Sequence, residues 1–395
     1  MTGGALSGLL VADFSRVLAG PYATMLLADL GAEVVKVERP GTGDDTRAWG
    51  PPYAPGGQAT YFLGVNRNKR SVALDLGDTA DLEVARALAT RADVLVENFR
   101  PGTMDRLGLG YDALRAPNPG LVYCSITGFG SGAGAGLPGY DLIAQAVGGL
   151  MSVTGEPGGT GTKAGVALVD VITGLHAALG VLAALRHRDH TGEGGHVTGA
   201  GRPHPGGGPG GGQRVEVSLL SSLLSALTNH SSAYAAAGVV PEAMGNRHPS
   251  IVPYEVFHAA DRPLVIAAGN DRQFQALCAV LDRPDLAVDP RYATNAGRVA
   301  ARDGLVAALD AVLRERPADE WFGLLTAAGV PCGPINDLAG AFALAEELGL
   351  EPSVRLGGTG QVAAPVRLGA TPPSYRRPPP ELGQDDAWVR EILGP

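Results

Sequence analysis

The stretch GYDLIAQAVGGLMSVTGEPGGTGTKAGVALVDVITGLHAALGVLAAL, residues 139–185, ends in a segment that predicts a buried helix. Residues 171–185 are apolar on almost every side, and only Thr173 and His176 interrupt them. A helix that is apolar all round belongs in a protein core. The apolar run is short for a membrane span and contains Asp170 and His176, so we expect no association with a membrane.

One carboxylate, Asp170, stands at the mouth of this predicted helix, directly after the apolar residues 166–169. The simplest interpretation is an N-cap, a position at which Asp is favoured. A second interpretation is chemical, because free backbone N–H groups and the helix dipole favour an ionised carboxylate at this position. An ionised carboxylate in a dry pocket can attack a thioester carbonyl and form an anhydride. The two interpretations are compatible.

The N-terminal part of the chain alternates short apolar segments with helical ones. Residues 8–14 and 34–37 are predicted strands, and the helix between them has Pro21 near its start and Gly31 just past its end. Further strands are expected at residues 94–99 and 121–126, with a helix at residues 81–91. This order predicts an α/β fold with a large Rossmann-like domain built on an open parallel sheet. The loop of residues 16–21 can place a phosphate or an adenosine at a helix N-terminus.

Glycine and proline divide the chain into parts. Residues 191–224 include a Gly/Pro-rich segment that cannot hold a packed core, so we expect an insertion and a linker there. The remaining predicted parts are a large domain at residues 1–190, a smaller α+β domain at 225–325, and a return to the large domain with a C-terminal arm at 326–395. The histidines of the insertion have no regular ligand spacing, so no metal site is expected.

Composition limits the classes of function. The chain has 31 Lys and Arg against 40 Asp and Glu, a net charge of −9, so no basic face for nucleic acid is expected. The three cysteines, Cys124, Cys278 and Cys332, form neither a disulfide framework nor a CxxC pair. The N-terminus also lacks a signal-peptide pattern. Together these features predict a cytoplasmic protein.

Basic residues gather in three segments, at residues 36–39, 67–70 and 100–106. Such charges are usually solvated, but these lie at predicted strand ends or in the loops beyond them, where open α/β sheets form ligand crevices. An anionic ligand is therefore expected at this edge of the sheet. A G-x-G-x-x-A match at residues 130–135 is followed by Pro138 and Gly139 instead of a helix, so a nicotinamide site is not expected.

The ordered blocks GYD, GGLMSVTG, GVALVD and TGLHAALGVLAAL resemble the central region of the family III CoA-transferases. KVERP, NRNKRS and VENFRPG are similar to three motifs through which that family contacts CoA. The resemblance covers nearly the whole chain apart from the insertion, and it implies that Asp170 is the catalytic nucleophile. It also implies an intertwined homodimer, and it implies no cofactor because the CoA thioester is itself a substrate.

The same motifs imply contacts with the ligand. Phosphate contacts are implied for Arg39 and Lys69, backbone contacts with adenine for Val17 and Ala19, contacts with the nucleotide and pantetheine for Asn98, Phe99 and Arg106, and a pocket-shaping role for Tyr140. Residues 268–271 resemble a mobile family loop that closes over the active site. An ordinary turn before a capped helix explains residues 268–271 equally well.

The expected reaction moves CoA from an acyl-CoA to a carboxylic acid through an aspartyl anhydride and an aspartyl-CoA thioester. The segment of residues 245–274 looks most like the subgroup that acts on succinate and glutarate, so succinyl-CoA is a candidate donor. A first alternative is the racemase branch of the same fold, but that branch has His where this chain has Tyr140, and a phenol is a poor base at neutral pH. A second alternative is a catalytically silent CoA-binding protein, which predicts loss of the nucleophile, whereas Asp170 is present.

Overall fold

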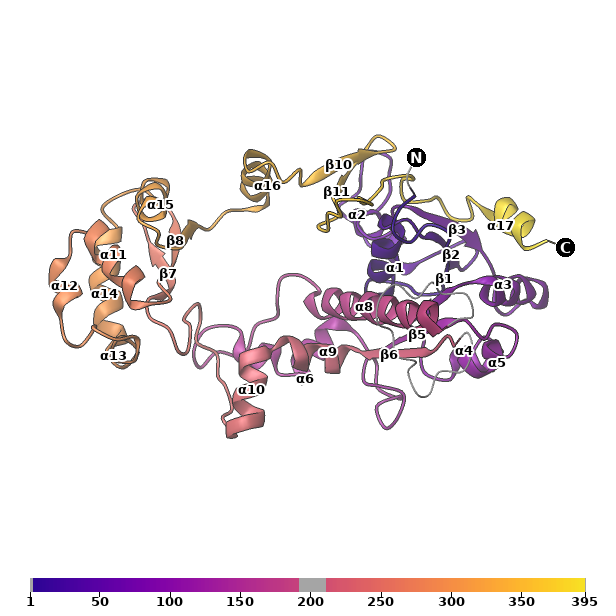
Figure 1. Cartoon of the computed structure of the whole chain (residues 1–395), viewed down its shortest axis with the longest axis horizontal. Helices are drawn as coiled ribbons and strands as arrows, with labels where there is room; N and C mark the ends of the chain where they lie inside the picture. The colour runs from indigo at the N-terminus through magenta and orange to yellow at the C-terminus, as the bar shows by residue number, and fades with distance from the viewer. Residues whose placement is uncertain (1–2, 192–210, 395) are drawn as a thin grey trace. The chain divides into compact units, whose positions relative to one another are not determined.

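The computed structural model describes residues 3–191 and 211–394, and these divide into two compact units (Figure 1). The larger unit comprises residues 1–150, 163–240 and 351–395, and the smaller unit comprises residues 151–162 and 241–350. The Gly/Pro-rich part of the expected insertion, residues 192–210, lies outside the described residues.

The larger unit is built on a six-stranded sheet in the order β3-β2-β1-β4-β5-β6, and each neighbouring pair is parallel. This is the Rossmann strand order, so the predicted α/β fold with an open parallel sheet is confirmed. The strands are β1 (Leu10–Asp13), β2 (Glu33–Glu38), β3 (Lys69–Ala73), β4 (Val94–Glu97), β5 (Val122–Thr127) and β6 (Arg214–Ser218). An antiparallel hairpin of the same unit pairs β10 (Ser353–Leu356) with β11 (Thr359–Val362).

Helices cover both faces of this sheet, because side chains alternate between the faces along each strand. Helices α1 (Ala19–Asp29) and α8 (Leu168–Thr191) lie on one face, and α3 (Thr79–Arg91) and α17 (Asp386–Leu393) lie on the other (Figure 1). Val11 of β1 packs with the first pair, whereas Ala12 and Phe14 pack with the second. The helices of the larger unit are α1 (Ala19–Asp29), the 3₁₀ helix η1 (Asp45–Ala48), α2 (Thr60–Leu63), α3 (Thr79–Arg91), α4 (Thr103–Arg106), α5 (Tyr111–Arg115), α6 (Asp141–Val147), α8 (Leu168–Thr191), α9 (Leu219–Ala226), α10 (Thr228–Ala237) and α17 (Asp386–Leu393). Helix α7 (Leu150–Val153) spans the boundary between the units.

Helix α8 is the predicted apolar helix, and by length and composition it could cross a membrane. It packs against α1, α9, β5 and β6. One side is nevertheless uncovered, because Leu175 is 46% exposed and Leu179 is 64% exposed. The expectation of a helix buried all round is therefore wrong for a single chain.

Strand β3 was not expected: residues 67–70 were interpreted only as a basic cluster at a strand end or in the loop beyond it, and no strand was predicted there. Lys69 and Arg70 instead begin the strand, which pairs with β2 from Val34↔Lys69 onward. The side chain of Lys69 is fully buried, and its ammonium forms an ion pair of 3.0 Å with Asp13. The ion pair with Asp13 thus buries a lysine side chain that the local sequence alone would predict to be exposed to solvent.

The smaller unit has the predicted α+β character. Its sheet is antiparallel in the order β7-β8-β9, and Phe257, Phe274 and Trp321 are buried in its core. Its elements are β7 (Tyr254–His258), β8 (Pro263–Ala267), α11 (Asp271–Val280), α12 (Pro284–Val288), α13 (Asn295–Ala300), α14 (Arg302–Leu313), α15 (Ala318–Ala327), β9 (Cys332–Pro334) and α16 (Leu338–Glu347).

The boundaries of this unit differ from the expected residues 225–325. Residues 225–240 remain with the larger unit, and residues 326–350 belong to the smaller one. The second difference has a simple cause, because β9 completes the smaller sheet by pairing with β8.

The proline-rich tail packs on the larger unit as the predicted extended arm. Between residues 372 and 379 it contains neither helix nor strand. The Ser374 N–H donates to the Asp29 carbonyl oxygen at 2.9 Å, and the Arg377 carbonyl accepts from the Asn68 N–H at 2.9 Å. The arm leads to α17, whose Val389 and Leu393 are buried in the core on the α3 side of the sheet.

Candidate active site

Asp170 lies in the first turn of α8, which begins two residues earlier at Leu168. The cap of this helix comes from α6: Asp141 Oδ1 accepts hydrogen bonds from the N–H groups of Val169 at 2.8 Å and Asp170 at 3.1 Å. The N-cap interpretation of Asp170 is therefore wrong. Asp141 performs the capping, and the Asp170 carboxylate projects from the turn next to it.

The Asp141 carboxylate is itself fixed in place. Gln145, one helical turn later on α6, donates from Nε2 to Asp141 Oδ2 at 2.5 Å. Gln145 is 1% exposed, and its Oε1 accepts from the Ala164 N–H at 2.8 Å. These contacts tie α6 to the segment before α8 and hold Asp141 close to Asp170.

The acidity of Asp170 follows from this surrounding. Burial, and then the negative charge of Asp141, raise the pKa of the Asp170 carboxyl to about 7. The expectation that free N–H groups of the helix N-terminus favour the ionised form of this carboxylate is not met, because Asp141 already accepts from the amides of the first turn and the pKa of Asp170 is raised. Near neutral pH both the protonated and the ionised forms of Asp170 are populated.

Asp170 lies on the wall of a cavity of about 190 Å³ within the larger unit. The cavity is at the carboxyl ends of β1 and β4, where the strand order reverses and where such sheets bind ligands. Its lining residues are Arg16, Val17, Leu18, Ala19, Asp45, Asn98, Phe99, Arg100, Pro101, Ile126, Thr127, Gly128, Leu137, Pro138, Gly139, Tyr140, Asp170 and Leu219.

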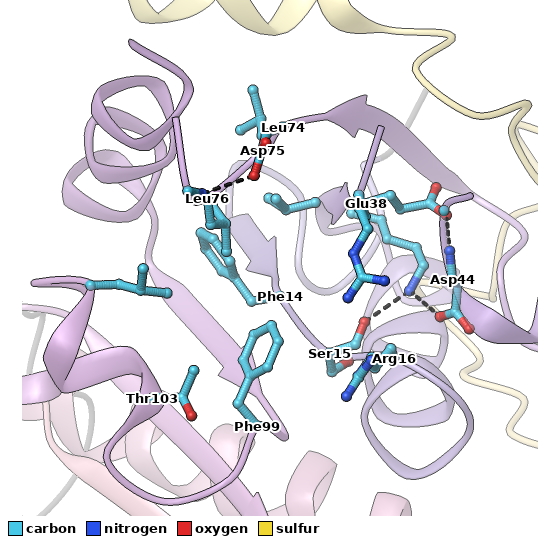
Figure 2. A pocket seen from close by; sticks show the side chains of 16 residues that line it. Phe14, Ser15, Arg16, Glu38, Asp44, Leu74, Asp75, Leu76, Phe99 and Thr103 are labelled. Carbon is cyan, nitrogen blue, oxygen red and sulfur yellow. Dashed lines mark hydrogen bonds and ion pairs between the residues drawn. The ribbon is translucent and has the colours of Figure 1, made fainter. Parts of the chain in front are cut away.

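A second cavity of about 330 Å³ shares Arg16 and Phe99 with the first. Figure 2 shows the rings of Phe14 and Phe99 on one side of it and Glu38, Asp44 and Arg16 on the other. Arg39 also lines this cavity and is exposed. The cavity therefore combines an apolar wall with two arginines, which suits a flat ring that carries phosphates.

The loop between β1 and α1 forms the boundary of both cavities. Asn98 fixes this loop, because its Oδ1 accepts from the Arg16 N–H at 3.0 Å and its Nδ2 donates to the Arg16 carbonyl at 2.7 Å. The Arg16 guanidinium lies 5.8 Å from the centre of the Phe99 ring. Asn98 and Phe99 follow β4 directly, so the ends of two adjacent strands hold one another.

Most residues expected at the site lie together. Val17, Ala19, Asn98, Phe99 and Tyr140 line the cavity of Asp170, and Arg39 lines the larger cavity.

Two expected residues, Lys69 and Arg106, line neither cavity. Arg106 donates to Thr103 Oγ1 at 3.1 Å. Lys69 Nζ is enclosed by Asp13, by the Pro21 carbonyl at 2.9 Å and by Asn66 at 3.1 Å. The expectation that Lys69 contacts a phosphate is therefore corrected, because its side chain is buried and lines neither cavity.

Several residues of the site were missed by sequence reasoning. Asp141 stands in the GYD block, but the amides it caps are 28 and 29 residues away, a distance that no local pattern reveals. The segment of residues 74–77, which follows β3, lines the larger cavity and was missed together with that strand. Tyr61 lies near the two carboxylates: burial, then the charges of Asp170 and Asp141, raise the pKa of its phenol to about 12.

Among residues 3–191 and 211–394, no group of three or more metal-ligating side chains is present. In the segment of residues 268–271, the side chain of Asn270 caps α11 by accepting from the Gln273 N–H at 3.0 Å. This geometry fits the interpretation of an ordinary turn before a capped helix. Closure of this segment over the active site stays a prediction.

Comparison with known proteins identifies the family. The model of CoA-transferase family III matches residues 6–201 and 207–386. The acetyl-CoA:oxalate CoA-transferase of Acetobacter aceti is 41% identical over 391 residues, which cover 98% of this chain and 95% of that protein. The succinyl-CoA:glutarate CoA-transferase of Homo sapiens is 40% identical over 395 residues, which cover 98% of this chain and 86% of that protein. Among solved structures, a CAIB/BAIF family protein from Brucella suis aligns over 100% of both chains with a TM-score of 0.86 and 38% identity. The chain therefore belongs to CoA-transferase family III and is an enzyme of the CoA-transferase type.

Proposed function

We propose that this enzyme moves CoA from a short acyl-CoA such as succinyl-CoA to a short dicarboxylic acid, with Asp170 as the covalent nucleophile. The observation that carries the proposal is the partly buried carboxylate of Asp170, which faces Asp141 instead of a cation, on the wall of a cavity at the carboxyl ends of β1 and β4. The choice of acids is supported by relatives named for succinyl-CoA and glutarate and for acetyl-CoA and oxalate.

The two cavities suggest how the acyl-CoA lies. The larger cavity, with Phe14, Phe99 and exposed Arg39, fits the adenine ring and its phosphates. Arg16 and Phe99 border both cavities, so the pantetheine arm would pass them to bring the thioester to Asp170. In this arrangement Tyr140, which is 63% exposed and lines the smaller cavity, shapes the acyl end of the site.

The proposed reaction exchanges acyl bonds only. An Asp170 carboxylate oxygen attacks the thioester carbonyl, the C–S bond breaks, and CoA leaves as a thiolate with an aspartyl–acyl anhydride left behind. The thiolate attacks the aspartyl carbonyl, which releases the first acid and leaves an aspartyl-CoA thioester. The carboxylate of the acceptor acid then reverses these two steps. Each step forms one bond and breaks one, with no net oxidation, so we propose that no cofactor takes part.

The acidity of Asp170 suits this role. A carboxylate whose pKa is raised to about 7 is more basic, and hence a better nucleophile, than one with the ordinary value near 3.8. It is also a better leaving group than an alkoxide, because a carboxylic acid is far more acidic than an alcohol, so the last step can release the Asp170 carboxylate from the anhydride. The neighbouring Asp141 contributes by raising the energy of the ionised form before reaction.

We also propose that the enzyme is an intertwined homodimer. Helices α6 and α8 pack against each other, and a single chain leaves four of their apolar side chains exposed, which supports the proposal. These side chains are Leu142 and Val147 on α6 and Leu175 and Leu179 on α8. Exposed apolar patches of this kind mark interaction surfaces. Sedimentation equilibrium of the wild type and of Leu179→Glu tests the proposal: a dimeric wild type and a weakened variant are expected, whereas a monomeric wild type would exclude it.

A cytoplasmic location is proposed as well. Cys124, Cys278 and Cys332 are all free thiols, which suits a reducing compartment. Cell fractionation with an antibody to the protein tests this location, and recovery in a membrane or extracellular fraction would contradict it.

The covalent step is tested by mass spectrometry. The enzyme is incubated with succinyl-CoA, quenched in acid and digested, and the peptide that contains Asp170 is expected to carry the added mass of an acyl or CoA group. The matched control is Asp189→Asn, which makes the same change at an exposed position on the same helix and should leave the adduct intact. An adduct on another peptide, or none on any, would overturn the assignment.

The substrates are tested separately, with a panel of carboxylic acids against succinyl-CoA as donor. Transfer to short dicarboxylic acids is expected, and transfer only to long-chain or aromatic acids would contradict the proposal. A racemase would instead exchange the α-proton of a 2-methylacyl-CoA in deuterated water without any acceptor acid, and no such exchange is expected.

A further inference from the structure

Val17 has a backbone conformation that its side chain disfavours. Its φ is +70°, in the left-handed region, which is a genuine outlier for a β-branched residue. Such a conformation costs free energy and persists only where the surroundings impose it. Val17 lines the cavity of Asp170, so the strain lies at the site itself.

Two buried charged residues surround this strained residue. Asp44 accepts the Val17 N–H on both carboxylate oxygens, at 3.3 and 3.2 Å. Lys36 forms an ion pair of 2.8 Å with Asp44 and also donates to the Ser15 carbonyl at 2.9 Å. Both side chains are 0% exposed, and the contacts at Ser15 and Asp44 are visible in Figure 2.

The loop is thus held at three consecutive residues. Lys36 holds the Ser15 carbonyl, Asn98 holds both backbone groups of Arg16, and Asp44 holds the Val17 N–H. Asp44 is also fixed from its other side, because it accepts from the Thr46 N–H at 3.0 Å as the cap of η1. Burial by itself would raise the pKa of Asp44, but the adjacent Lys36 ammonium lowers it to about 2, so the acceptor stays ionised.

We propose that Asp44, held by the buried ammonium of Lys36, is a positioning residue that keeps Val17 in its left-handed conformation so that the loop of residues 15–19 can bind acyl-CoA. Asp44 borders the larger cavity, but its side chain is 0% exposed and is engaged by Lys36 and the Val17 N–H, so it acts through the backbone of Val17. The inference rests on the proposed function only in that this loop contacts CoA. It predicts that CoA binding depends less on Asp44 once residue 17 can adopt a positive φ without strain.

The test compares the effect of Asp44→Ala, which removes the acceptor of the Val17 N–H, in three backgrounds. In the wild type we expect it to raise the Kd for CoA, measured by calorimetry, and the KM for acyl-CoA about tenfold, with a smaller change in kcat. In Val17→Gly the same change should cost about threefold or less, because glycine adopts positive φ without strain. Val17→Ala is the matched control: it also shortens the side chain, but it keeps the strain, so the full tenfold effect is expected.

Equal losses of CoA affinity in the glycine and alanine backgrounds would overturn the proposal, as would no loss in the wild type. Asp44→Ala leaves Lys36 buried without its partner and can therefore fail to fold, so the charge-neutral pair Lys36→Met/Asp44→Ala is taken through the same backgrounds with the same expectation. The Kd for CoA is measured without turnover. An error in assigning Asp170 as the nucleophile would therefore appear in kcat of Asp170 variants and leave this comparison intact.

Discussion

Two groups of carboxylates in the larger unit have opposite surroundings: three buried ones beneath the first loop, and the partly buried Asp170 with its neighbour Asp141. Asp13, Glu38 and Asp44, beneath the first loop, each lie within 3.0 Å of a cation, at Lys69, Arg47 and Lys36. Burial opposes ionisation in all three, but these cations lower the pKa of each carboxyl below its ordinary value. Asp170 instead faces Asp141, and its pKa is raised to about 7.

This difference distinguishes carboxylates that support the fold from a carboxylate that can react. A buried carboxylate that is paired with a cation is stable in its ionised form and has little tendency to react. A buried carboxylate beside a like charge is poised to bind a proton or attack an acyl carbon. The first group shapes the loop of residues 15–19, and the second lies on the cavity wall beyond it.

The largest effect is expected at Asp170, the carboxylate that faces another carboxylate instead of a cation. Asp170→Asn removes the proposed nucleophile, so kcat for CoA transfer should fall about 10⁴-fold or more. The fold should persist, because an amide replaces a buried charge that has no cationic partner. Steady-state kinetics and a thermal melt check both points. Transfer activity within tenfold of the wild type would show that Asp170 is not the nucleophile.

Removing the cation from one of the paired carboxylates should lower the stability of the fold. Lys69→Met leaves Asp13 buried without its cation, and we expect the free energy of unfolding to fall by about 3–5 kcal/mol in urea titration. The folded fraction should keep its KM for acyl-CoA, because Lys69 lines neither cavity.

The matched variant is Arg39→Met, which removes an exposed cation from the larger cavity. It should raise the KM for acyl-CoA severalfold while stability changes little. The reverse pattern, with a raised KM for Lys69→Met and none for Arg39→Met, would restore a phosphate contact for Lys69.

The like-charge contact can be removed without losing the helix cap. In Asp141→Asn the amide oxygen can still accept from the Val169 and Asp170 N–H groups, but the negative charge is gone. The pKa of Asp170 should therefore fall, and the acid limb of the pH profile of kcat should move to lower pH by about one unit. Asp189→Asn is the control and should not move it. An unchanged acid limb in Asp141→Asn would mean that another group limits turnover.

The fold was largely predictable from the sequence because its signals are local. The strand–helix–strand unit of residues 8–37 has apolar strands and well-placed Pro21 and Gly31, and the structure has β1, α1 and β2 there. Strand β3 was missed because it begins with two cations, Lys69 and Arg70, and only the ion pair of Lys69 with the distant Asp13 explains the burial of Lys69.

The site was less predictable, because its contacts join residues that lie far apart in the sequence. Asp170 was identified by resemblance to a family and not by local pattern, which favoured a helix cap. The true cap is Asp141, and neither its contact with residues 169 and 170 nor the raised pKa of Asp170 can be deduced from spacing. The strained φ of Val17 is likewise invisible in the sequence, because valine is not a residue that predicts a left-handed turn.

The smallest expected effect is in the pH dependence of stability, where the two groups should have opposite signs. The pKa of Asp170 is raised from 3.8 to about 7 on folding, so its contribution to stability is fully present below pH 3.8 and is lost as pH rises towards 7. The pKa of Asp44 is lowered to about 2, so its contribution is present above pH 3.8 and is lost as pH falls towards 2. Asp170→Asn should therefore match the wild type near pH 4 and become more stable by about 1–2 kcal/mol near pH 8, after allowance for partial exposure of the carboxylate. Urea titrations of both proteins at pH 4, 6 and 8 measure this difference. A constant offset between the two proteins across this range would mean that Asp170 is not held as an uncompensated charge, and the contrast between the two groups of carboxylates would then be lost.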